Sequence, residues 1–562
     1  MKKDKTVIKT GFLQGAFIVT LCIVITKILG ILYVIPFHWL IGDKGGALYG
    51  YAYTIYLFFM SISSAGIPLA ISRIVSEYQT LGYMNAKRRT FIMGKKIALL
   101  LGFVSFLILM IFAPFIAKAV LGNLSGGNKI EDVVFVIRVI SSAILIVPVL
   151  SIYRGYFEGH RFMRAPAISQ VLEQIVRILV IIMGSFLTLK VFKLSLTTTV
   201  GVAVFGATLG GFVSYLYLVE KRLKNKKKFN EKIRVNNEPI ITDKQIFRKI
   251  VVYAVPFIMI DLFKSLYSFV DMLTVVKGLV YKASFTTSNA EVIMSMLSTW
   301  TAKFNMIIIS ISTGVVVNLI PNLTESYVKK DNKDINKKIN QSLNIILSMA
   351  LPMCLGISFL ARPIWVLFYG NSVYGPSVLS YSIFIGIFSA LFTTAISIIQ
   401  VFKDYRALFI SLISGVLLKI IFNIRLIEAF SSLGLPAYYG IISATIIGYL
   451  TSFVICLVIL KKKYHVCYED VVKNFFDILC ASILMIIVLY LISRFIPTYS
   501  DIRIVNLGII IVYTLIGFLS YILYTYKSGT IKNIYGNKLI KLFKIKKWFN
   551  HFFWFIITLI II

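Results

Sequence analysis

Charged residues are scarce in this chain, and acidic residues are the scarcest of them. Only 15% of the 562 residues are charged, with 59 Lys and Arg against 23 Asp and Glu. Soluble domains average about a quarter charged residues, so this composition excludes a soluble fold. Hydrophobic residues make up 58% of the chain, and its mean hydropathy is +0.86. Apolar runs of about 20 residues, long enough to cross a bilayer as helices, recur along the whole sequence.

Cysteine, histidine and the motifs of soluble enzymes are also rare or absent. The five cysteines show no paired spacing, and the four histidines lie outside the middle of every apolar run. The sequence has no P-loop, no GxSxG, no HExxH and no glycine-rich dinucleotide motif. We therefore expect no disulfide framework, no metal site, no bound cofactor, no enzyme activity and no ATP-driven transport.

Fourteen apolar runs are candidate membrane spans. They lie at 12–37, 47–70, 97–117, 133–153, 168–189, 197–219, 250–276, 299–320, 341–360, 378–401, 407–424, 437–460, 475–493 and 504–526. Most Lys and Arg lie in alternate connections counted from the N-terminus, which is the positive-inside pattern. We therefore expect a multi-pass plasma-membrane protein with both termini in the cytoplasm. The net charge of +36 then reflects topology, and no nucleic-acid partner is expected.

Two basic segments flank these spans. The connection 220–249 separates six spans from the next six, and it is interpreted either as a solvated linker or as a contact for anionic lipid headgroups. The tail 527–562 mixes lysines with bulky apolar residues. This mixture predicts an amphipathic helix in the cytoplasmic interface, and a short fifteenth crossing is the alternative.

The two sets of six spans resemble each other. Similar residues recur 249 residues apart for Tyr78–Tyr327 and Pro114–Pro363, and 245 residues apart for Phe157–Phe402 and Arg161–Arg406. Duplication of an even number of spans keeps both copies in one orientation, and such halves enclose a central cavity. We predict an all-α polytopic membrane protein with about 14 transmembrane helices. Its parts are an N-terminal six-helix lobe (1–219), a linker (220–249), a pseudo-symmetric C-terminal six-helix lobe (250–460), two extra helices (461–526) and the tail (527–562).

Charged residues inside the spans are the candidate substrate residues. A charge at the bilayer centre costs about 2.5–3.5 kcal/mol, so it normally faces a wet cavity or a partner. These residues are Lys27, Glu173, Arg177, Asp261, Lys264, Asp271 and Lys303. Their positive excess suits an anionic substrate such as a lipid pyrophosphate. The alternative is that Glu173–Arg177 and Asp261–Lys264 are neutral pairs that hold helices together. Arg138 and Lys419 are interpreted as side chains that snorkel to an interface.

Gly66 and Pro68 lie at the cytoplasmic end of the second span. Proline removes a backbone hydrogen bond, so it bends a helix or marks its end. The sequence alone leaves both interpretations open.

Three motifs give the chain a family resemblance. KILGILYVIPF (27–37), GIPLAISRIVSEY (66–78) and YRGYFEGHRFMRAPAISQVLEQIVRI (153–178) resemble the polysaccharide-transporter branch of the multidrug/oligosaccharidyl-lipid/polysaccharide exporter superfamily. The MurJ-like lipid II flippases and the stage V sporulation protein B group are the nearest members, and LYSFVDMLTV (266–275) favours the former. The resemblance implies two lobes around a cavity, a lipid-tail groove formed by the last two spans, and alternating access without ATP. It also implies coupling to membrane potential or to a monovalent ion.

The resemblance carries over to few individual residues. Lys27 matches a basic position of the family's first span, and Lys303 lies near a basic cavity position of the eighth. The arginine–aspartate pair of Gram-negative members is replaced here by Tyr33 and Val34, so their headgroup contacts do not transfer. Arg73 is a candidate substitute for their arginine in the second span.

The expected cargo is therefore a polyprenyl-linked cell-wall precursor, lipid II first. A capsule, teichoic acid or spore-cortex intermediate is the alternative cargo on the same fold. Small-cation drug efflux is disfavoured by the cationic set and by the two extra spans. A non-transporting scaffold for cell-wall synthesis enzymes is the remaining alternative, and those enzymes are candidate partners in any case.

Overall fold

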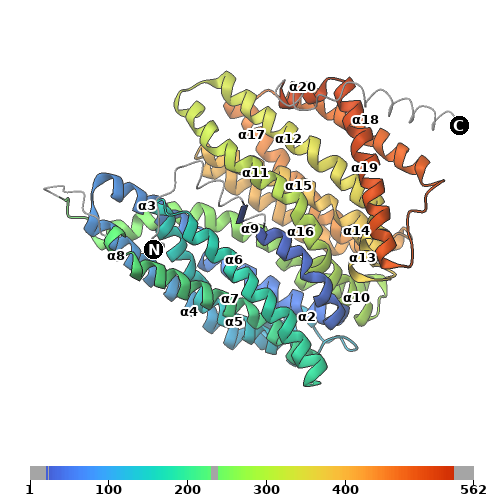
Figure 1. Cartoon of the computed structure of the whole chain (residues 1–562), viewed down its shortest axis with the longest axis horizontal. Coiled ribbons are helices and arrows are strands. Elements are labelled where there is room, and N and C mark those ends of the chain that lie inside the picture. Colours follow the sequence, from blue (N-terminus) through green and yellow to red (C-terminus); the bar gives the residue numbers. More distant parts are fainter. Residues whose placement is uncertain (1–20, 23–24, 230–237, 537–562) are drawn as a thin grey trace, which may run out of the picture. The chain divides into compact units, whose positions relative to one another are not determined.

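The computed structural model describes residues 21–22, 25–229 and 238–536 (Figure 1). Within these ranges the chain is helical and forms no β-strand. Twelve stretches in them are long and apolar enough to cross a membrane. They coincide with all but two of the predicted spans: 12–37 is described only in part, and 250–276 lies inside α9 (Asp243–Ala283). The predicted all-α fold with about 14 transmembrane helices is confirmed. Most of the predicted tail, 537–562, lies outside the described residues.

The chain divides into two compact units, Met1–Thr299 and Trp300–Ile562. The N-terminal unit contains α2 (Val34–Ser63), α3 (Ile67–Leu81), α4 (Met84–Leu121), α5 (Ile130–Gly159), α6 (Arg164–Leu179), α7 (Leu196–Lys224), α8 (Lys226–Phe229), α9 and α10 (Thr287–Ser295). Two π-helical segments, Val180–Gly184 and Leu187–Val191, continue α6. Because α7 runs to Lys224 and α9 begins at Asp243, helix occupies both ends of the predicted linker. The predicted lobe boundaries stay predictions.

The C-terminal unit contains both the second set of spans and the two extra ones. Its helices are α11 (Thr301–Val328), α12 (Asn332–Phe359), α13 (Ala361–Tyr369), α14 (Gly375–Ser382), α15 (Phe384–Val401), α16 (Tyr405–Ser432), α17 (Tyr438–Tyr464), α18 (Glu469–Ile492), α19 (Arg503–Lys527) and α20 (Thr530–Tyr535). A π-helical segment, Met296–Trp300, joins α10 to α11. Helices α18 and α19 pack on each other and on α12 and α13.

The second predicted span is interrupted at the glycine and proline noted in the sequence. Helix α2 ends at Ser63, and α3 restarts at Ile67 with Gly66 as its N-cap and Pro68 in its first turn. Proline is tolerated there because the first N–H groups of a helix have no intrahelical partner. A Cβ on Gly66 would lie 2.2 Å from the carbonyl oxygen of Ala254, so only glycine lets α3 approach α9 this closely. The structure therefore resolves the two interpretations in favour of a helix end.

The turns of the two halves repeat in backbone geometry. Left-handed residues follow α3 at Gly82 (φ 77°) and α11 at Lys330 (φ 56°), and positive-φ glycines follow α4 at Gly122 and α13 at Gly370. Both pairs are 248 residues apart. The left-handed residues after α5 and α15 are Arg161 and Lys403, which are 242 residues apart. The helix ends thus support a duplication but correct the two offsets. Residue-type matches in the loops had slipped by one position at the first turns and by three at the later one.

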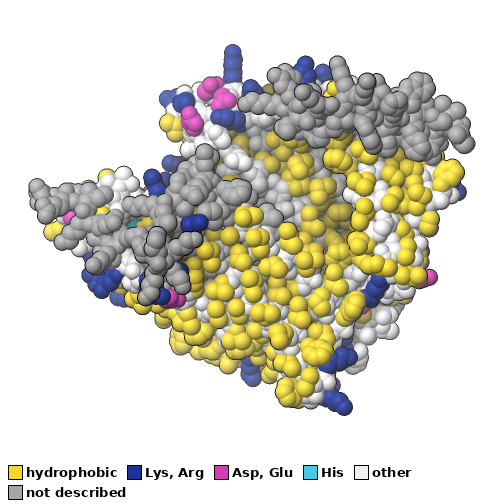
Figure 2. Space-filling view, in the orientation of Figure 1, with side chains coloured by type: hydrophobic (Ala, Val, Ile, Leu, Met, Phe, Trp, Pro, Cys, Tyr) yellow, Lys and Arg dark blue, Asp and Glu magenta, His cyan; other side chains and the backbone are white. Residues whose placement is uncertain are grey.

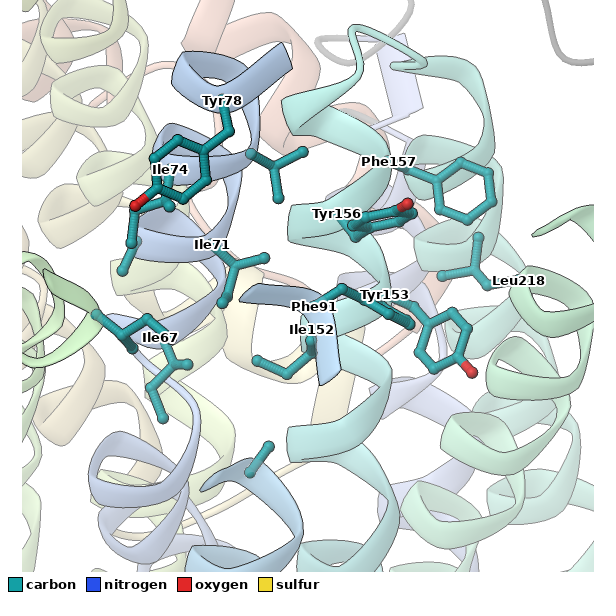
Figure 3. Packing of buried hydrophobic residues seen from close by; sticks show 14 of the residues in the cluster. Ile67, Ile71, Ile74, Tyr78, Phe91, Ile152, Tyr153, Tyr156, Phe157 and Leu218 are labelled. Atoms are coloured by element: carbon teal, nitrogen blue, oxygen red, sulfur yellow. The ribbon is translucent and has the colours of Figure 1, made fainter. Parts of the chain in front are cut away.

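A hydrophobic cluster packs α3, α4, α5 and α7 of the N-terminal unit together (Figure 3). Ile71 and Phe157 in this cluster are fully buried, and the Phe91 ring meets the Tyr156 ring at a centroid distance of 4.3 Å. Lipid tails are as apolar as these side chains, so close packing holds helices together inside a bilayer. The C-terminal unit repeats the pattern: α15 packs on α11, α12 and α17 as α5 packs on α3, α4 and α7.

The outer helix surfaces are apolar. On α4, Leu99 and Leu100 are each 61% exposed and Phe115 is 72% exposed. Figure 2 shows hydrophobic side chains over the visible faces of α6 and α7, with Lys and Arg gathered toward the helix ends. Exposed apolar surface of this extent suits helices that face hydrocarbon, with cations at the headgroup level.

Candidate functional site

A buried cluster of three charges joins α5 to α6 in the N-terminal unit. Arg154 of α5 donates a hydrogen bond from Nη2 to Glu173 Oε2 at 2.8 Å, and Arg177 Nη2 donates to Glu173 Oε1 at 2.7 Å. The side chains of Arg154, Glu173 and Arg177 are 16%, 13% and 14% exposed. Arg154 Nε also donates to Ser169 Oγ at 2.9 Å. With two guanidinium groups and one carboxylate, the cluster carries a formal charge of +1.

Small residues on the neighbouring helix fix the position of this cluster. A Cβ on Gly210 of α7 would lie 2.6 Å from the carbonyl oxygen of Glu173, and one on Gly206 would lie 3.0 Å from that of Arg177. Helix α7 can therefore press directly on the backbone of α6 at the charged turn. Such small-residue contacts are how membrane helices reach close packing.

Arg177 keeps a hydrogen-bonding atom unused. Its Nε is buried and has no hydrogen-bond partner among the described residues. Tyr49, Tyr53 and Tyr56 of α2 lie close enough to interact with it electrostatically. The rings of Tyr49 and Tyr53 stack at 5.7 Å with an interplanar angle of 11°. The arrangement presents a cation, a spare N–H donor and tyrosine side chains, which together suit an anionic, hydroxyl-rich ligand.

The structure brings together only part of the predicted site. Glu173 and Arg177 form the expected i,i+4 pair. Arg73 is exposed on α3, with its guanidinium 4.4 Å from the Tyr253 ring centroid. On α9, Asp261 is exposed and interacts electrostatically with half-buried Lys264.

The remaining predicted residues lie apart from the charged cluster in the chain. Asp271 is half-buried further along α9. Lys27 is half-buried before α2, and Lys303 is half-buried at the start of α11 in the C-terminal unit. A role of any of these residues in substrate binding stays a prediction.

Arg154 was missed by reasoning from the sequence. It directly follows the predicted span 133–153, so it was counted with the basic loop residues. In the structure α5 continues to Gly159, which keeps Arg154 within the helix and opposite Glu173. A signal was available in the motif YRGYFEG…LEQIVRI, where one intramembrane acid accompanies two arginines.

Lys419 corrects another interpretation. The lysine was expected to snorkel to an interface, but it is fully buried on α16. Its Nζ donates to oxygen atoms of Asn423, Ile441 and Thr445, so local acceptors replace the interface.

An apolar groove of about 720 Å³ runs through the C-terminal unit. Residues of α11, α12, α13, α18, α19 and α20 line it, and nearly all are apolar. Representative lining residues are Met353, Gly356, Phe368, Leu489, Gly517 and Phe518. At one end of the groove Tyr521 donates to the carbonyl oxygen of Ser348 at 2.8 Å, and the Ser348 hydroxyl lies 2.9 Å from Tyr535. The groove therefore has an apolar channel and one polar end.

Comparison with known proteins gives the relationship of the chain. A family model described as polysaccharide biosynthesis protein matches residues 12–297. Lipid II flippase MurJ of Bacillus subtilis (strain 168) is 32% identical over 547 residues, which covers 95% of this chain and 98% of that protein. The chain belongs to the polysaccharide biosynthesis protein family. Stage V sporulation protein B of the same organism is 26% identical over 231 residues, 40% of this chain and 43% of that protein.

Solved structures show the fold of this family member. Lipid II flippase MurJ in an inward closed conformation matches with a TM-score of 0.66 and 16% identity, covering 91% of this chain and 99% of that one. An inward-facing multidrug resistance MATE family transporter of the MOP superfamily matches with a TM-score of 0.58 and 12% identity, covering 80% of this chain and 98% of that one. Together with the twelve candidate spans, these likenesses make the chain a multi-pass membrane protein.

The acids of this family member are not arranged for metal binding. Among the residues that the structure describes, no group of three or more His, Cys, Asp or Glu could hold a metal ion. Each of its five cysteines is free. The charged cluster and the groove are thus the two features with the chemistry of a ligand site.

Proposed function

We propose that this family member is a lipid II flippase that moves the precursor from the cytoplasmic to the outer leaflet by alternating access. The observation that carries the proposal is the likeness to lipid II flippase MurJ along nearly the full length of both chains. The other relatives give less support to a capsule, teichoic acid or spore-cortex cargo, because stage V sporulation protein B aligns with only 40% of this chain. Multidrug efflux is supported only by likeness of fold.

The apolar groove suits the polyprenyl tail. Its lining residues come largely from α12, α13, α18 and α19, so the two extra helices supply one wall. An isoprenoid chain in this groove would stay in an apolar environment while its headgroup moves, so the tail need not cross water. The polar end beside Ser348, Tyr521 and Tyr535 would limit how far the tail enters.

The charged cluster suits the pyrophosphate. Glu173 neutralises one of two guanidinium groups, which leaves one positive charge and the spare Nε–H of Arg177. Arginine binds phosphate oxygens with two parallel hydrogen bonds, which neutral donors cannot match in strength. Arg154 would act as a positioning residue by holding Glu173. The remaining cations Lys27, Arg73, Lys264 and Lys303 are proposed to raise the positive potential along the path of the headgroup.

The energy source is proposed to be membrane potential or a monovalent ion, since the sequence contains no nucleotide-binding motif. No covalent chemistry on the lipid is proposed, so the chain is not an enzyme. The basic connection and the basic tail are proposed to lie in the cytoplasm with both termini, beside anionic lipid headgroups. Cell-wall synthesis enzymes are proposed partners, because they make and consume the cargo.

Depletion in living cells tests the function. Cells depleted of this protein should accumulate lipid II whose headgroup is inaccessible to an external probe, and expression of the wild-type chain should restore access. Unchanged external lipid II after depletion, in cells without a second flippase, would exclude this cargo. A capsule or teichoic acid precursor that accumulates instead would identify the alternative cargo.

A further inference from the structure

Lys419 lies in the interior of α16, in the middle of a candidate membrane span. Its side chain is fully buried, and so is that of Asn423 one turn further along the helix. A buried ammonium is costly unless hydrogen-bond acceptors replace its water shell. The surroundings of Lys419 therefore decide what this residue does.

Three oxygen atoms from two helices surround the ammonium. Lys419 Nζ donates to Asn423 Oδ1 at 2.9 Å, to Thr445 Oγ1 at 2.6 Å and to the carbonyl oxygen of Ile441 at 3.2 Å. These three acceptors match the three N–H donors of a lysine ammonium. The hydroxyl of Thr445 itself donates to the carbonyl oxygen of Ile441 at 3.1 Å. Its proton is therefore directed away from Lys419, and a lone pair is left for the ammonium.

The two helices that carry these oxygens are held very close together. A Cβ on Gly440 of α17 would lie 2.4 Å from the carbonyl group of Leu426 on α16. The backbone carbonyl of Ile441 follows directly after this contact, so its position relative to α16 is fixed by the packing of Gly440. The three oxygens are thus preorganised by the helix pair rather than gathered by a flexible loop.

The donor set has the chemistry of a monovalent-cation site. An amide oxygen, a hydroxyl oxygen and a backbone carbonyl oxygen are hard, uncharged ligands of the kind that bind Na⁺ and K⁺ in membrane proteins. In this chain the cation is attached to α16 by a covalent bond. A tethered cation cannot dissociate, so its occupancy does not depend on the ion concentration on either side of the membrane.

We propose that Asn423 Oδ1, the Ile441 carbonyl oxygen and Thr445 Oγ1 form a monovalent-cation cage that the chain fills with its own Lys419 ammonium. The tethered cation joins α16 to α17 in the way that a bound Na⁺ would, and it makes this part of the C-terminal unit independent of free cations. Removal of the lysine side chain should then convert the cage into a site for a free monovalent cation.

The test measures thermal unfolding of purified protein in NaCl and in choline chloride at equal ionic strength. The wild-type Tm should be the same in both salts within about 1 °C. K419A should unfold at a lower temperature in choline chloride, and NaCl should raise its Tm by about 3 °C or more, because Na⁺ enters the emptied cage. K419M, which fills the space with an uncharged chain of similar length, is the matched control and should not respond to Na⁺.

A double variant assigns the response to the cage. K419A/T445V lacks one of the three oxygens, so NaCl should raise its Tm by less than half of the K419A response. A wild-type protein that is itself stabilised by Na⁺ would overturn the proposal, as would K419A that ignores Na⁺, or K419M that responds as strongly as K419A. Should K419A not yield folded protein, K419S replaces it in the same comparison, and the wild-type arm remains decisive on its own.

Discussion

Arg154 on α5 and Glu173 on α6 form a buried ion pair, with Arg154 Nη2 at 2.8 Å from Glu173 Oε2. Arg177, one turn along α6, occupies the second carboxylate oxygen at 2.7 Å. One acid therefore holds two arginines in place, and the arginines rather than the acid determine the sign of the local charge. Such a triad fixes helix positions and presents a cation at the same time.

E173Q should destabilise the protein strongly, since two guanidinium groups would then lie close together without a carboxylate. Loss of one partner of a buried pair costs about 3–5 kcal/mol. The Tm of purified E173Q should fall well below that of wild type. E220Q is the matched control, because Glu220 pairs with Lys224 at four residues' spacing but is 52% exposed. Exposed pairs of this kind are worth about 0.3–0.5 kcal/mol. Equal Tm values for the two variants would contradict a structural role of Glu173.

Sequence reasoning found the fold and only part of the site, for physical reasons. The span pattern and the duplication follow from hydropathy, charge and turn residues, which are local properties. The pairing of Glu173 with Arg177 was also local, since four residues place both on one helical face. The contact of Arg154 with Glu173 depends on how α5 packs against α6, and the cage around Lys419 depends on how α16 packs against α17. Long-range packing of this kind leaves no periodic signal in a single sequence.

Filling the apolar groove should block transport without unfolding the protein. Gly356 on α12 lines the groove, and a Cβ there would meet no atom within 4 Å. G356F should therefore fold normally, and replacing a helical glycine even favours the helix by roughly 0.5–1 kcal/mol. Its rate of lipid flipping in vesicles should fall at least about tenfold, equivalent to 1.4 kcal/mol.

The control for the groove is G508F. Gly508 lies on α19, is exposed, does not line the groove and would also meet no atom within 4 Å with a Cβ. G508F should keep the wild-type rate. Equal rates for G356F and wild type would remove the groove from the transport path.

G66A should destabilise the N-terminal unit, because its added methyl group would clash with the backbone of α9 at 2.2 Å. Overpacking of this kind costs about 1–3 kcal/mol. The matched control is G314A on α11, where a Cβ would meet no atom within 4 Å and stability should be unchanged or higher. Thermal unfolding of the two purified variants makes the comparison. A Tm of G66A at or above that of G314A would show that α3 can move away from α9 without cost.

The cytoplasmic turn before α16 predicts a pH dependence of stability. Lys463 Nζ lies 2.6 Å from Asp404 Oδ2, and this contact with backbone and tyrosine hydrogen bonds holds the pKa of Asp404 below its usual value. A lowered pKa stabilises the fold above the unfolded value of about 3.9, and the contribution is lost as pH falls through the folded pKa. D404N retains the oxygen that accepts from the Ala407 N–H but loses the charge.

The Tm of wild type should therefore exceed that of D404N at pH about 7, and the difference should shrink below pH about 4. D404A, which also removes the helix N-cap, should lose about 1 kcal/mol more at every pH. A wild-type advantage that grows as the pH falls would mean that the Asp404 carboxylate destabilises the fold.

Reconstitution tests the central claim most directly. Vesicles that contain only this protein, lipid II and phospholipid are probed from outside for accessible lipid II headgroups over time. Wild-type protein should carry lipid II between the leaflets until the probe reaches nearly all of it, while G356F vesicles stay close to the protein-free level. Protein that binds lipid II but leaves the inner-leaflet pool inaccessible would contradict the account.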